Sequence, residues 1–143
     1  MRTEKILFIY PSFPSEAIVA AGKIGEPNPT LEVTEYPTEF SLLAATGLIG
    51  INLDKGYVLS TNVYLDGELA TDPEDTPSLV SHSQNISLEG TYVTTFGVPL
   101  RVRATKPGIY TLRLSLYEKT KGDEQIFIDE KETQLVISEG WGS

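Results

Sequence analysis

One segment near the C-terminal end constrains the fold more than any other, because it combines a turn with a strongly alternating strand. The turn contains Pro107 and Gly108; proline fixes φ, and glycine tolerates positive φ. From Tyr110 to Tyr117, apolar and polar side chains then alternate. A period of two is typical of an antiparallel strand with one buried face and one solvent-facing face. The chain is therefore expected to build a sheet around this strand.

Similar patterns recur along the rest of the chain, separated by segments rich in Gly, Pro, Asp and Ser. We predict eight to ten strands and no helix. The clearest strand patterns cover residues 5–10, 31–36, 57–65, 86–92, 100–104 and 110–117. Short strands at this spacing are typical of an all-β sandwich or barrel.

Two segments are less regular. Residues 40–53 contain Leu and Ala, which favour a helix, but Gly47 and Gly50 interrupt the pattern. We predict a strand there because the surrounding segments all have strand patterns. The last strand covers residues 126–137 and is expected to contain a bulge around Asp129 to Glu132, because its two halves do not share one register.

The length of 143 residues predicts one domain over residues 1–143. A chain of this size can bury a core without disulfides, and this one has no cysteine. Its longest polar segment, residues 68–83, is rich in Asp, Pro, Ser and Thr and predicts a long exposed loop. Residues 139–143 are expected to form a short flexible tail.

The chain is acidic, with 11 Lys and Arg against 20 Asp and Glu and a formal net charge of −9. Phosphate groups repel such a surface, so we expect no direct binding to nucleic acid or anionic membranes. The N-terminal apolar run is soon ended by Pro11 and is too short for a signal peptide or a membrane span. We therefore expect a cytoplasmic protein.

The segment from Pro107 to Leu112 resembles the tyrosine corner of immunoglobulin-like and other Greek-key sandwiches. The resemblance covers residues 93–137 and implies an antiparallel Greek-key β-sandwich. It also implies that Tyr110 hydrogen-bonds back to the preceding connection. The cysteine pair and buried tryptophan of antibody domains are absent, since the only tryptophan is Trp141 in the tail. The chain is also similar to small uncharacterised bacterial or phage β-sandwich proteins, which implies no activity.

Catalytic and metal-binding patterns are weak. His82 is the only histidine and lies between two serines, but neighbouring loop positions rarely form a catalytic triad. One histidine without cysteine is a poor set of zinc ligands. Asp72, Glu74 and Asp75 lack the spacing of a calcium-binding EF-hand loop. We expect no enzyme, no cofactor and no metal.

Three arginines stand out in this acidic chain, namely Arg101, Arg103 and Arg113, because all are predicted to face outward on successive strands. Together they would form a basic strip that binds an anion or an acidic partner. The alternative is cross-strand pairing with residues such as Glu89. An immunoglobulin-like topology would also separate the two strands onto opposite sheets.

The expected function is therefore a non-catalytic protein-binding module that uses a sheet face or its long loops. One alternative is an acidic, phage-encoded inhibitor of a nucleic-acid-binding enzyme, which would need acids in ordered rows. Another is a structural subunit of a homo-oligomer. The apolar run Ile6 to Ile9 carries little edge protection and is either a central strand or a strand that pairs with another chain.

Overall fold

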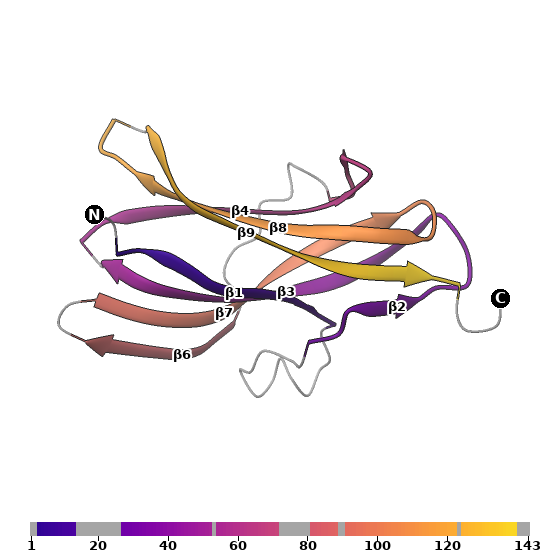
Figure 1. The fold of residues 1–143 in the computed structure, drawn as a ribbon, viewed down its shortest axis with the longest axis horizontal. Helices are drawn as coiled ribbons and strands as arrows, with labels where there is room; N and C mark the ends of the chain where they lie inside the picture. The colour runs from indigo at the N-terminus through magenta and orange to yellow at the C-terminus, as the bar shows by residue number, and fades with distance from the viewer. Residues whose placement is uncertain are drawn as a thin grey trace.

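Two sheets lie face to face in the computed structural model of the chain (Figure 1), which describes residues 3–13, 27–52, 54–71, 81–88, 91–122 and 124–139. One sheet has the order β1-β3-β7-β6, and the other has the order β2-β9-β8-β4-β5. The pairs are antiparallel except for the parallel pair β2 and β9. The strands are β1 (Lys5–Ser12), β2 (Thr30–Glu32), β3 (Thr38–Asn52), β4 (Gly56–Leu65), β5 (Glu68–Leu69), β6 (Ser81–Leu88), β7 (Thr91–Ala104), β8 (Gly108–Lys119) and β9 (Gln125–Ser138).

These two sheets confirm the prediction of an all-β, sandwich-like fold. The described residues contain no helix, and hence none that could cross a membrane. The single domain over residues 1–143 remains a prediction.

The core lies between the two sheets, and β8 supplies its centre. The alternating side chains Tyr110, Leu112, Leu114 and Leu116 are all fully buried. They pack with apolar residues of β3 and β7 from the other sheet. Each buried side chain of this size stabilises the fold by about 1.5–3 kcal/mol relative to its exposed state. The alternation recognised in the sequence is therefore the pattern that joins the sheets.

Within the described part of the segment 40–53, residues 40–52 confirm the strand prediction, since β3 runs through both glycines without a helical turn. Gly50 has a φ of 77°, and the register between β3 and β7 shifts between Leu48 and Ile51. A Cβ atom at Gly50 would also collide with the Thr3 carbonyl group. Gly50 thus allows a bulge within a continuous strand. It does not mark the interruption of a helix.

Several predicted boundaries are wrong. The predicted strand 86–92 belongs to two strands, since residues 86–88 end β6 and residues 91–92 begin β7, while residues 89–90 lie outside the described part. Strand β2 is shorter than the predicted segment 31–36. Within residues 68–83, the ends belong to β5 and β6, while residues 72–80 lie outside the described part. Of the tail, residues 140–143 also lie outside it.

The final strand does contain a bulge, slightly earlier than expected. Leu116 faces Asp129 and Tyr117 faces Phe127, so Ile128 is the extra residue on β9. The extra residue returns Phe127 to the outer face beside Tyr117. The two rings meet edge to face with their centroids 5.9 Å apart, a usual separation for an aromatic pair.

Strand β1 lies at the edge of its sheet, so Ile6 to Ile9 is not central. One of its edge amides is occupied, because the Ile6 N–H donates to the Asp129 carboxylate at 2.9 Å. Asp129 therefore protects the β1 edge from across the sandwich.

The hydroxyl group of Tyr110 donates to the Lys106 carbonyl at 2.7 Å, as the resemblance to a tyrosine corner implied. Pro107 and Gly108 lie between donor and acceptor, so the bond closes the turn that leads into β8. Because the ring of Tyr110 is fully buried, this bond ties the turn to the core.

Replacing Tyr110 with Phe should lower the free energy of unfolding by about 0.5–1.5 kcal/mol, the usual contribution of one such hydrogen bond. Urea unfolding of the variant and the wild type measures the difference.

Tyr36→Phe is the matched control, because the buried Tyr36 hydroxyl has no hydrogen-bond partner within the described residues. Removing it should leave stability unchanged or raise it. Equal losses in the two variants would contradict a specific role for the Tyr110 bond.

Candidate functional site

The three arginines singled out in the sequence do not form one strip. Arg101 and Arg103 lie on β7 in the four-stranded sheet, whereas Arg113 lies on β8 in the five-stranded sheet. The two strands are consecutive in the chain but belong to opposite layers (Figure 1). The separation foreseen for an immunoglobulin-like topology is therefore present.

Arg113 is engaged on the outer face of its own sheet. Its Nε–H donates to Glu132 Oε1 at 2.6 Å, and its guanidinium lies 4.8 Å from the centre of the Tyr64 ring. The hydrogen bond that Arg113 donates to the Glu132 carboxylate raises the pKa of Arg113. Both side chains are well exposed, at 39% and 46%, so the pair is worth at most about 1 kcal/mol. The suggested partner Glu89 lies outside the described residues.

Arg101 and Arg103 line a groove with a volume of about 590 Å³. It lies beside the β4–β5 hairpin and reaches the tyrosine corner. Its lining residues include Glu39 on β3, the hairpin residues Leu65, Asp66, Glu68 and Leu69, and Lys106 and Tyr110 at the corner.

The hairpin that forms one wall of this groove follows from local sequence. Asp66 and Gly67 both have positive φ, 51° and 82°, as a tight two-residue hairpin requires. After the hairpin, the chain crosses to the other sheet. The Arg103 N–H donates to the Ala70 carbonyl at 2.9 Å, and Thr71 forms an isolated bridge with Val102. Residues 70–71 thereby join the two layers next to both arginines.

Of the three basic side chains that line the groove, Lys106 has an acidic partner, and the two arginines have none among the described residues. Lys106 forms an ion pair with Asp66 at 3.1 Å. Arg103 lies opposite Glu39 in the β3–β7 register, and Arg101 lies opposite Ser41. However, no ion pair or side-chain hydrogen bond joins either guanidinium group to a residue in the described ranges. The two arginines are exposed and available to an external acceptor.

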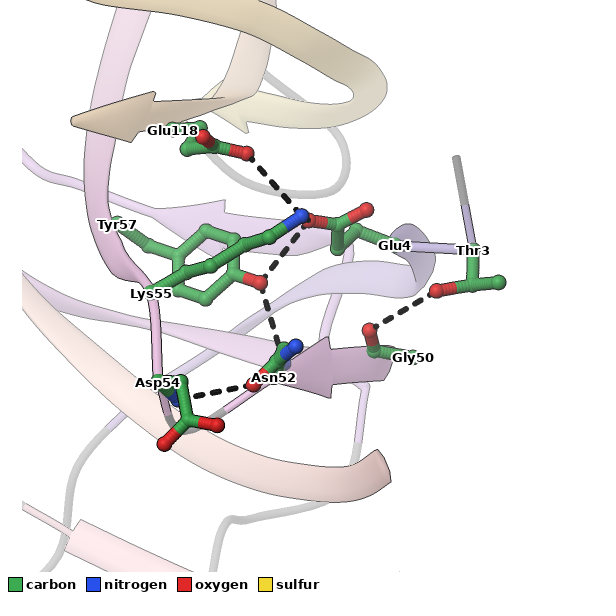
Figure 2. A network of polar contacts seen from close by, with 8 residues as sticks. All are labelled: Thr3, Glu4, Gly50, Asn52, Asp54, Lys55, Tyr57 and Glu118. Atoms are coloured by element: carbon green, nitrogen blue, oxygen red, sulfur yellow. Dashed lines mark hydrogen bonds and ion pairs between the residues drawn. The ribbon is translucent and has the colours of Figure 1, made fainter. Parts of the chain in front are cut away.

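A second polar cluster, at the end of the sandwich where β1 begins, was not predicted (Figure 2). The Glu4 side chain is only 3% exposed and lies 3.7 Å from Lys55 Nζ. The Tyr57 hydroxyl donates to Glu4 Oε2 at 2.9 Å and accepts the Asn52 N–H at 3.1 Å. Lys55 also reaches Glu118 at 3.5 Å. We call Glu4, Lys55, Tyr57 and Glu118 the buried-acid cluster.

The buried-acid cluster places a buried carboxylate, that of Glu4, between a tyrosine hydroxyl and a lysine. Burial raises the pKa of Tyr57, and the nearby Glu4 carboxylate raises it further, against the opposing effect of the Asn52 N–H. Tyr57 therefore remains a donor to Glu4 over the ordinary pH range. In the sequence, Glu4 is an ordinary charged residue before a strand, and only the meeting of β1, β4 and β8 buries it.

The described residues add no support for the metal-binding and catalytic candidates considered from the sequence. No group of three or more His, Cys, Asp or Glu residues that could hold a metal is present in the described ranges. The backbone of His82 belongs to β6 and not to a loop. The calcium candidates Asp72, Glu74 and Asp75 lie outside the described residues.

Comparisons with known proteins give no family for this chain. No protein-family model matches it, and no curated protein is significantly similar to it in sequence.

Tyr57→Phe should lower the free energy of unfolding by about 1.5–3 kcal/mol at neutral pH, because it removes a hydrogen bond to a buried charged group. The difference from wild type should shrink at high pH. The folded-state pKa of Tyr57 is raised, so its contribution is complete below the unfolded-state pKa and is lost as pH rises through the folded-state value.

Tyr92→Phe serves as the control, since Tyr92 is also half-buried and its hydroxyl group makes no hydrogen bond within the described residues. Its effect should stay within about 0.5 kcal/mol. Urea unfolding over a pH series compares the two variants, and indistinguishable losses would contradict the structural role of the Tyr57 hydroxyl.

Proposed function

We propose that the chain is an immunoglobulin-like Greek-key sandwich. In that fold, strands A, B, E and D form one sheet, and strands C, F and G form the other. The order β1-β3-β7-β6 corresponds to A-B-E-D, and β9-β8-β4 corresponds to G-F-C, which supports the assignment. The Tyr110 hydrogen bond at the start of β8 supports it as well.

Within this fold, we propose that the protein is a non-catalytic binding module whose groove takes an acidic peptide segment of a partner protein. One observation carries the proposal: two arginines with no charged partner among the described residues lie side by side in a groove of an acidic chain. A guanidinium group binds carboxylates through paired N–H donors, which gives both strength and orientation.

The spacing of the two arginines indicates which peptide sequence the groove would bind. Arg101 and Arg103 are two positions apart on one strand, so their Cα atoms are separated by about 7 Å. Side chains two positions apart in an extended peptide have the same spacing. The groove therefore suits an extended segment with two acidic residues separated by one other residue. Leu65 and Leu69 offer apolar contacts for a neighbouring side chain.

The alternative of an acidic inhibitor has less support. Two outward acids of β9, Glu130 and Glu132, contact Ser115 and Arg113. Acids on this face are thus interleaved with an arginine and a serine, whereas a nucleic-acid mimic needs ordered acidic rows.

We expect the double variant R101Q/R103Q to bind at least tenfold more weakly than wild type, since each lost charged hydrogen bond costs about 1.5–3 kcal/mol. The probe is a labelled peptide containing Glu-Leu-Glu, titrated by fluorescence anisotropy, with Gln-Leu-Gln as the uncharged peptide.

The control variant K5Q/K121Q removes the same charge from exposed positions outside the groove. It should bind the Glu-Leu-Glu peptide as tightly as wild type does. This result would show that the loss in R101Q/R103Q comes from the groove and not from the change in net charge. Equal binding by R101Q/R103Q, or equal binding of both peptides, would contradict the proposal.

A further inference from the structure

The outer face of the five-stranded sheet carries a regular pattern along β8 and β9, on the opposite layer from the two groove arginines. On β8 the outward residues are Ile109, Thr111, Arg113, Ser115 and Tyr117, and the residues paired with them on β9 are Val136, Gln134, Glu132, Glu130 and Phe127. We call these ten residues the outer face of β8–β9. No described strand packs over it, since the other sheet covers the inner side.

This face is apolar at both ends and charged in the middle. Ile109 and Val136 are 59% and 41% exposed at one end, and Phe127 is 56% exposed at the other. Arg113 and Glu132 form the central row. The two apolar rows lie about 14 Å from it on either side. Exposed apolar side chains grouped in this way mark an interaction surface.

We propose that the outer face of β8–β9 binds the same face of a second copy of this chain. A two-fold axis that runs parallel to the strands, between β8 and β9, places β8 of each copy over β9 of the other. Every row then meets a complementary one: Ile109 meets Val136, Tyr117 meets Phe127, and Arg113 meets Glu132. Such self-complementarity is what an isologous interface requires.

The charges select this arrangement over its alternative. An axis across the strands would place Arg113 on Arg113 and Glu132 on Glu132, which is repulsive. With the axis along the strands, two arginines and two glutamates alternate around a ring. Arg113 uses only its Nε–H for the Glu132 of its own chain within the described residues. Its terminal N–H groups remain for the second copy.

The bulge at Ile128 contributes to the self-complementarity of the outer face of β8–β9. Without the extra residue, Phe127 would point to the inner side of the sheet, since side chains alternate along a strand. The bulge aligns its ring with Tyr117 and completes the second apolar row. Face-to-face packing of two sheets at an angle of about 30° is a common arrangement.

Sedimentation equilibrium of the full chain across the micromolar range tests the proposal. Wild type should reach twice the monomer mass of 15.7 kDa. Arg113→Glu brings four carboxylates together and should return the mass to that of the monomer. The charge-swapped double variant R113E/E132R restores the alternating ring and should restore the dimer.

Two controls keep the result specific. Lys121→Glu makes the same change of charge at an exposed turn and should leave the dimer intact. Ile109→Asp should dissociate it, whereas Leu7→Asp, which alters an exposed leucine on the other sheet, should not.

A wild type that stays monomeric throughout, or an Arg113→Glu variant that remains dimeric while folded by circular dichroism, would overturn the proposal. The same conclusion would follow if Lys121→Glu or Leu7→Asp dissociated the dimer. Binding of the Glu-Leu-Glu peptide by monomeric Arg113→Glu reports on the groove separately.

Discussion

The inner face of β8 holds the molecule together, because its four fully buried side chains lie at the centre of the contact between the sheets. Tyr110 connects that contact to the chain leading into it, through its hydrogen bond to Lys106. Once β8 is fixed in this way, its outer face and the adjacent turn are fixed as well. The inner side chains of β8 are buried in the core, and this burial fixes the position of the strand. The strand in turn positions its own outer residues and the end of the groove at the tyrosine corner.

Contacts between the layers shape the groove, the β1 edge and the buried-acid cluster. Residues 70–71 cross from the β4–β5 hairpin to β7, and this crossing places a wall beside Arg101 and Arg103. Asp129 crosses in the other direction, from β9 to the edge amide of Ile6. The buried-acid cluster is a third contact of this kind, joining β1, β4 and β8 (Figure 2). Each depends on residues that are distant in the chain.

Much of the fold could be predicted from local pattern. The strand at β8, the tight turn at Asp66 and Gly67, and the bulge in β9 all follow from alternation, turn chemistry or a change of register. Prediction failed where the same pattern continued from one strand into the next, as from β6 into β7, because alternation alone does not mark where a strand ends. For the site, the sequence identified Arg101 and Arg103 but grouped Arg113 with them, since proximity in sequence does not specify the sheet to which a strand belongs.

Local sequence is enough to predict a corner and a half-buried strand over residues 106–117, because dihedral preferences and side-chain alternation are local properties. The same alternation predicts which side of that strand is polar. The neighbours of that polar side follow from the packing of the whole chain: Glu132 and Tyr64 lie beside Arg113, and an exposed apolar row lies at each end. These neighbours come from the pairing of β8 with β4 and β9, and pairing depends on how the whole chain buries its apolar surface.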